Sequence, residues 1–129
     1  MTKLDPIIAV KDVEASAQWY HQIFGFRNAH GGKDFAVLLD EDDVVMLCLH
    51  QWGIDEHPSL SDQRIPAGNG FLLYFKTDNM PKMLNRVEQM HWPIEEALHQ
   101  NPNSRRKEFS LKDPDGYFIT VTTYHEYEG

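Results

Sequence analysis

The sequence is short of cysteine and of long apolar runs, and each shortage excludes a class of protein. Cys48 is the only cysteine among 129 residues, so an internal disulfide and a cysteine-rich zinc site are both excluded. Because Cys48 stands inside the apolar run from Val44 to Leu49, we expect it to be a small buried residue. No apolar run reaches the length of about 18 residues that a membrane-spanning helix needs, and the first residues lack the apolar core of a secretory signal. We therefore expect a cytoplasmic protein with no membrane partner.

Positive charge is also scarce, with 12 Lys and Arg against 20 Asp and Glu and a net charge of −8. Such a balance repels phosphate backbones, and no basic stripe interleaved with aromatic residues offsets it. Nucleic acid is therefore not an expected partner. The acidity is compatible with a cationic ligand, but the ordinary needs of solubility are the preferred explanation.

The chain has the size of one domain, and its first half has the pattern βαβββ. Residues 5–10 form an apolar strand candidate, and Asp12 is placed to cap the helix that follows. Gly25 ends this helix, and residues 26–30, 34–39 and 44–49 are three short strand candidates. One apolar stripe marks the helix: Val13, Ala17, Tyr20 and Phe24.

The second half repeats this order after a linker over residues 51–68, which is rich in Pro, Gly, Ser and Asp. Residues 70–77 predict a strand, Asp78 is placed to cap a helix with Pro81 in its first turn, and residues 94–98, 107–111 and 117–124 predict three strands. The acidic turn at residues 40–43 corresponds to residues 113–116. We therefore predict an α+β fold in a single domain, 1–129, in which two tandem βαβββ modules, 1–50 and 69–129, form a curved mixed sheet.

Two motifs resemble the vicinal-oxygen-chelate superfamily, which includes glyoxalases, bleomycin-resistance proteins and extradiol dioxygenases. The first is a strand that ends in Val10-Lys11-Asp12-Val13, followed by Trp19-Tyr20 and then Phe24-Gly25-Phe26. The second is Lys112-Asp113-Pro114-Asp115-Gly116, a turn into the last strand. Both motifs stand at the right ends of the two modules, and the resemblance covers nearly the whole chain.

The resemblance implies a divalent metal held by four inward-facing side chains, two from each module. By position these fall on Asp5, Leu47, Leu72 and Thr120, with Phe71 as the alternative to Leu72. Of these four side chains only the Asp5 carboxylate is a strong ligand for a cation, whereas a stable metal site needs three or more such donors. We therefore expect no metal and no other cofactor. A replacement site made of His50, Glu56 and His57 stays open, although their spacing matches no rigid ligand motif.

The same strand positions predict the lining of a concave sheet. Side chains two apart point the same way, so the predicted lining adds six residues to the former ligand positions: Ile7, Val45, Leu49, Tyr74, Phe118 and Thr122. Asp5, Tyr74 and Thr120 are its polar groups, and Trp52 in the linker is placed to close over a planar ligand. Alternatively, these side chains pack against one another as an ordinary core.

We therefore predict a metal-free homodimer that binds a small, partly aromatic or cationic molecule, as the resemblance to bleomycin-resistance proteins implies. The alternative is a lyase, isomerase or dioxygenase of the superfamily with a non-standard metal site, or with Asp5 or Tyr74 as general acid or base. A purely structural partner is a third reading. No nucleophile motif is present, so no catalytic residue is assigned.

Overall fold

The computed structural model describes residues 1–53, 58–60, 62, 64 and 70–124, and the chain divides into two compact units. The first unit is Met1–Ala67 and the second is Gly68–Gly129. The residues expected to form a linker therefore belong almost entirely to the first unit. Neither helix of the described residues is long and apolar enough to cross a bilayer.

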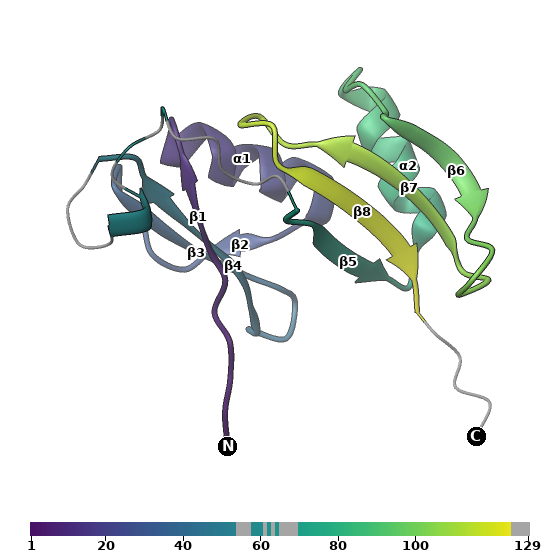
Figure 1. Cartoon of the computed structure of the whole chain (residues 1–129), viewed down its shortest axis with the longest axis horizontal. Coiled ribbons are helices and arrows are strands. Elements are labelled where there is room, and N and C mark those ends of the chain that lie inside the picture. The colour runs from purple at the N-terminus through teal and green to yellow at the C-terminus, as the bar shows by residue number, and fades with distance from the viewer. Residues whose placement is uncertain (54–57, 61, 63, 65–69, 125–129) are drawn as a thin grey trace. The chain divides into compact units, whose positions relative to one another are not determined.

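The first unit has the predicted order βαβββ (Figure 1). Its elements are β1 (Ile7–Val10), α1 (Val13–Phe24), β2 (Arg27–Asn28), β3 (Phe35–Leu39) and β4 (Val45–Gln51), followed by the short 3-10 helix η1 (Pro58–Leu60). The strands form one mixed sheet in the order β1-β4-β3-β2, in which β1 and β4 are parallel. The α1 helix contacts β2, β3 and β4, so it covers one face of this sheet.

The α1 helix begins and ends as the sequence predicts. The Asp12 side chain accepts a hydrogen bond from the Ala15 backbone N–H, at 3.0 Å, and so satisfies one unpaired donor of the first turn. Gly25 ends the helix with φ at 75°, a left-handed conformation that glycine adopts without strain. The whole predicted stripe is buried: Val13, Ala17, Tyr20 and Phe24.

The second unit repeats the order βαβββ. Its elements are β5 (Leu73–Thr77), α2 (Met80–Gln89), β6 (Glu96–Gln100), β7 (Lys107–Lys112) and β8 (Phe118–Thr123). The strands form a second mixed sheet in the order β5-β8-β7-β6, with β5 and β8 parallel. The α2 helix lies on one side of this sheet (Figure 1). The predicted α+β class with two βαβββ modules is therefore confirmed.

The start of α2 differs from the prediction by one residue. Asn79, and not Asp78, caps the helix, because the Asn79 side chain accepts a hydrogen bond from the Lys82 backbone N–H at 3.2 Å. The Thr77 hydroxyl accepts from the Asn79 N–H and fixes the chain before the cap. Both Asp and Asn are good caps, so composition alone does not separate the two positions.

The two acidic turns have the same hydrogen bonds, which supports the internal repeat. Asp40 Oδ1 accepts from the backbone N–H groups of Asp42 and Val44, both at 2.9 Å. In the second unit Asp113 Oδ1 accepts from the second and fourth residues after it, at 2.9 and 2.8 Å. The left-handed position of each turn holds Asp43 (φ 61°) and Gly116 (φ 89°), respectively. The aspartate that opens each turn therefore holds it together.

Candidate functional site

The two faces of the first sheet are separated by strand pairing. Phe35 pairs with His50, and their rings lie 6.0 Å apart, so both side chains lie on one face. Leu38 and Leu47 form a pair three residues further along each strand, which places them on the opposite face. Leu38 and Leu47 are fully buried, as expected for side chains under α1. We call the other face, which carries Phe35 and His50, the helix-free face of the first sheet.

This pairing corrects the predicted lining at Leu47 and Leu49. Both leucines face α1, whereas Cys48 and His50 lie on the helix-free face with Ile7, which pairs with Cys48. The physical reason is a β-bulge. Leu38 pairs with Leu47 but the next residue, Leu39, pairs with Val45, so Met46 is an extra residue in β4. An extra residue reverses the alternation beyond it, so a count from the acidic turn is right for Val45 and wrong for both leucines.

The negative charge of Asp5 acts on the thiol of Cys48, which lies on the helix-free face of the first sheet. Asp5 is exposed, whereas Cys48 is buried. Burial raises the pKa of the Cys48 thiol, and the negative charge of Asp5 raises it further. Since the thiolate is the form that binds metals and attacks electrophiles, Cys48 is a weak ligand and a weak nucleophile.

His50 and Trp52 stand at the end of β4. His50 is buried, and its Nδ1 lies 2.8 Å from the carbonyl oxygen of Gln51, so this nitrogen is the donor. The backbone N–H of Trp52 donates to the carbonyl of Val10, at 3.3 Å, and its side chain is half-buried. Of the predicted replacement metal site, Glu56 and His57 lie outside the described residues.

The helix-free face of the second sheet is polar. Phe109 and Leu111 on β7 pair with Val121 and Ile119 on β8, and all four are fully buried. The alternate side chains of these strands therefore point away from the helix. They include Glu108, Ser110, Thr120 and Thr122, all buried, and the half-buried Phe118; Tyr74, which pairs with Thr120, lies on the same face. Phe118, Thr120, Thr122 and Tyr74 thus share one face, as the alternation predicts.

Leu72 stands immediately before β5 and is 47% exposed. Its place two residues before Tyr74 puts it in line with that face. In contrast to Leu47, Leu72 is therefore not part of the core under a helix. Phe71 beside it is also exposed, and its ring lies 6.3 Å from the ring of Tyr117.

Tyr74, Glu108 and Asn101 form a hydrogen-bonded group on the second sheet. The Tyr74 hydroxyl donates to Glu108 Oε2 at 2.7 Å, and the Asn101 side-chain amide donates to Glu108 Oε1 at 2.8 Å. Burial alone would raise the pKa of Glu108, but the hydrogen bonds from Asn101 and Tyr74 outweigh it and hold that pKa below the ordinary value. Burial of the hydroxyl and its bond to Glu108 raise the pKa of Tyr74. At neutral pH the group is therefore a neutral phenol that donates to an ionised carboxylate.

A second polar pair lies beside this group. The Ser110 and Thr120 hydroxyls are 2.9 Å apart, and both residues are buried. The sequence reading found Thr120 and Tyr74 but missed Glu108, Ser110 and Asn101. Glu108 and Ser110 alternate with Phe109 and Leu111, a pattern typical of a strand with one polar face. Only the strand pairing shows that this polar face is buried.

The donor positions do not fit the divalent metal that the resemblance implies. On the first sheet, Asp5 offers an exposed carboxylate, and the position predicted for Leu47 is taken by Cys48, a thiol that holds its proton. On the second sheet, Leu72 has no donor atom and the Thr120 hydroxyl is bonded to Ser110. Within the described part of either unit, no three His, Cys, Asp or Glu side chains lie close enough together to hold a metal ion. We therefore derive no chemistry through a metal.

Two mixed sheets of this topology, each with one helix and one helix-free face, define a class of protein built from paired βαβββ modules. The model of the Glyoxalase/Bleomycin resistance protein/Dioxygenase superfamily matches residues 3–121, and the chain belongs to this family. A comparison with curated proteins gives no significant match.

Solved structures with the same fold cover nearly the whole chain. An integron cassette protein of V. cholerae is 25% identical, covers 96% of each chain and has a TM-score of 0.72. A lactoylglutathione lyase from Agrobacterium tumefaciens is 16% identical, covers 99% of this chain and 97% of its own, and has a TM-score of 0.72. A glyoxalase/bleomycin resistance protein/dioxygenase family enzyme from Burkholderia phytofirmans is 20% identical, covers 91% and 94%, and has a TM-score of 0.74. At the identities of the last two, the likeness is one of fold.

Proposed function

We propose that this protein is a metal-free small-molecule-binding member of its family, with a partly aromatic ligand on the helix-free face of the second sheet. The observation that carries the proposal is that Tyr74 is partly exposed while its hydroxyl is hydrogen-bonded inside the protein. Its side chain is 42% exposed while its hydroxyl is fixed on Glu108 at 2.7 Å. A ring held by its own hydroxyl loses little further freedom when a planar ligand stacks on it.

The surroundings of Tyr74 have the composition of a small-molecule site. Leu72, which is exposed and stands two residues before Tyr74, supplies apolar surface on the same face. Three polar groups of the face, the Glu108 carboxylate and the hydroxyls of Ser110 and Thr120, are already held by hydrogen bonds inside the protein. Apolar walls with a few fixed polar groups are typical of ligand sites, because the walls give affinity and the polar groups give orientation.

The choice of binding over metal-dependent turnover depends on the donor set described above. Polarising two substrate oxygens requires a Lewis acid held by several protein donors, and the strand positions supply one exposed carboxylate and a protonated thiol. Tyr74 is unsuited to act as a general base near neutral pH, because its phenol has a raised pKa and already donates its proton to a carboxylate.

The first test is metal analysis of protein purified without chelator. We expect less than one transition metal per chain. One tightly held metal per chain, lost in Asp5→Ala, would reject the proposal, as would turnover of methylglyoxal hemithioacetal or catechols on addition of Ni, Zn, Mn or Fe.

The second test is a thermal-shift screen with small aromatic compounds, since a ligand that binds only the native state raises the melting temperature. Tyr74→Leu should abolish the shift given by a compound that binds the wild type. Tyr124→Leu is the matched control, because Tyr124 is also exposed and follows the last strand of the same sheet. Equal shifts in both variants would contradict the place assigned to the ligand.

A further inference from the structure

Arg106 has two buried donors with no acceptor. Its Nε and Nη1 atoms are shielded from solvent and make no hydrogen bond with any described residue. Arg106 directly precedes β7 and stands two residues before Glu108, so it belongs to the same helix-free face. Its positive charge lowers the pKa of Tyr74, against the effects of burial and of Glu108, which places the guanidinium near the phenol. A buried donor without an acceptor costs the protein its lost hydration, so a ligand acceptor would relieve that cost.

The nearby carboxylate does not serve as this acceptor. Both oxygens of Glu108 receive other donors, Oε1 from Asn101 and Oε2 from Tyr74. No carboxylate among the described residues forms an ion pair with Arg106, since the ion pairs of that part of the chain involve other residues. The guanidinium charge therefore has no direct counter-charge within the described structure.

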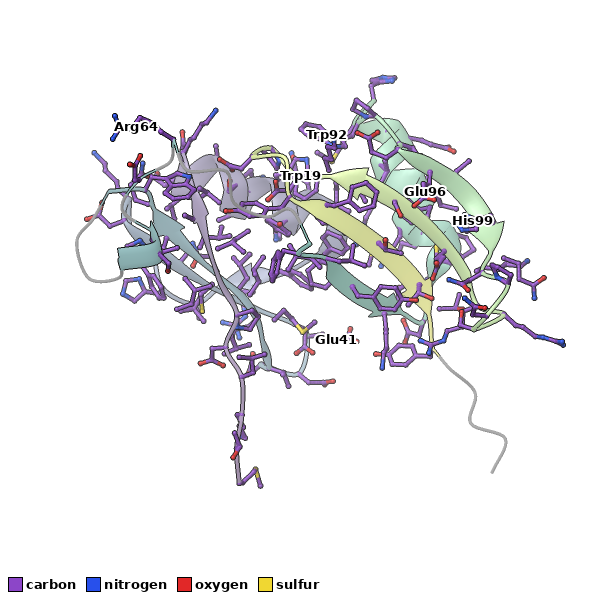
Figure 2. The ribbon with its side chains drawn as sticks, viewed as in Figure 1. Trp19, Glu41, Arg64, Trp92, Glu96 and His99 are labelled. Atoms are coloured by element: carbon purple, nitrogen blue, oxygen red, sulfur yellow. The ribbon has the colours of Figure 1, made fainter. Side chains whose placement is uncertain are left out.

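Other groups at this end of the sheet are also basic. Lys76 is exposed on β5 and pairs with Thr122, which in turn pairs with Glu108. His99 on β6 pairs with Glu108 from the other side, and Figure 2 shows it on the outermost strand of the sheet. The one acidic group among them, Glu108, is buried and hydrogen-bonded. Among the residues that the structure describes, basic groups therefore outnumber acidic ones at this end of the face, in a chain whose net charge is −8.

We infer that the ligand carries an oxyanion, a carboxylate or a phosphate, and that Arg106 binds it at this end of the second sheet. The inference rests on the proposed function and names the chemical class of its ligand. It replaces the cationic ligand suggested by net charge, because charges more than about 8–10 Å away are largely screened at physiological salt, whereas a guanidinium in contact is not. The planar guanidinium also matches the two oxygens of a carboxylate or phosphate better than an ammonium group does.

The test uses inorganic phosphate and acetate as probes, titrated into the full chain at constant ionic strength with chloride as the reference salt. We expect a saturable rise in melting temperature for the wild type with at least one of the two anions. Arg106→Gln should weaken the apparent affinity by about tenfold or more, since a hydrogen bond to a charged group contributes roughly that factor. Arg106→Lys keeps the charge and loses the planar donors, so its apparent affinity for the anion should lie between those of the wild type and Arg106→Gln.

Arg105→Gln is the matched control, because Arg105 is the exposed neighbour in the same hairpin and its loss changes net charge equally. It should retain the wild-type response. An equal response of Arg106→Gln and wild type, or an equal loss in both arginine variants, would overturn the inference. If Arg106→Gln does not fold, the side-chain Nε–H resonance of Arg106 in the wild type decides: a saturable shift with phosphate or acetate supports the inference, and no shift overturns it.

Failure of the inference is distinct from failure of the proposed function. Suppose that aromatic compounds bind the wild type and Arg106→Gln equally and that neither protein responds to phosphate or acetate. This result would overturn the inference that the ligand carries an oxyanion, while the proposed binding function would stand. One transition metal per chain with turnover would reject the binding function, whatever the anions do.

Discussion

The hydrogen bond between Tyr74 and Glu108 allows us to predict how much stability the protein loses when the Tyr74 hydroxyl is removed. Tyr74→Phe removes the hydroxyl and leaves the ring, so Glu108 Oε2 loses its donor at 2.7 Å. Glu108 is 6% exposed, so water replaces this donor poorly. A hydrogen bond to a charged group contributes about 1.5–3 kcal/mol. We expect a loss near the lower end of this range, because the Tyr74 side chain itself is 42% exposed.

The loss should depend on pH in a definite direction. The pKa of Glu108 is lower in the native state than its ordinary value of 4.5, so the native state favours the ionised carboxylate. Its stabilisation is present above the unfolded-state pKa and is lost as the pH falls through the lower native pKa. The difference between wild type and Tyr74→Phe should therefore shrink toward acid. At the alkaline end, the raised pKa of Tyr74 makes wild-type stability fall as the pH rises above the ordinary tyrosine value of 10.0.

The measurement is urea denaturation of wild type, Tyr74→Phe, Glu108→Gln and the double variant, from neutral to acid pH. At neutral pH the double-mutant cycle should give a coupling of about 1 kcal/mol or more, since residues in direct contact do not act additively. Tyr124→Phe is the control, with a change within about 0.5 kcal/mol, because its side chain is exposed. Additive losses at neutral pH, or a Tyr74→Phe effect that is constant down to acid pH, would refute the reasoning.

Three further predictions test the strand register, the repeated turn and the assembly. Leu47→Ala should lower the free energy of unfolding, measured by urea denaturation, by about 2–5 kcal/mol, as for a large side chain deleted from a core. Cys48→Ala should lower it less, because fewer atoms are removed. The reverse order would contradict the assignment of Leu47 to the α1 side of the sheet. Asp113→Ala should lower the free energy of unfolding by about 1–3 kcal/mol, because two backbone N–H groups lose their acceptor. Asp40→Ala should lower it less, because its turn is exposed. Negligible losses in both variants would show that these carboxylates do not hold the turns. Light scattering should give twice the 15.0 kDa chain mass, as expected for a homodimer, and a monomer mass at all concentrations would reject it.

The local pattern of the sequence determined the order of elements and both ends of α1. The spacing of Val13, Ala17, Tyr20 and Phe24, with Asp12 before and Gly25 after, is sufficient to define α1, because helix periodicity and end chemistry are properties of neighbouring residues. The same holds for the two aspartate turns, since Asp40 and Asp113 bond only to residues within four positions. The repeat, and through it the family, was therefore readable from the sequence alone.

Only the tertiary structure decided which side chains share a face. A single extra residue at Met46 reverses the alternation in β4, and nothing in the run Val44 to Leu49 marks that bulge, because its residues are all apolar and suit either face. The contact between Tyr74 and Glu108 was equally hidden, since these residues are far apart in sequence and meet only when β5 and β7 both pair with β8. Periodicity reports which residues alternate, whereas the pairing of strands far apart in sequence determines which of them meet.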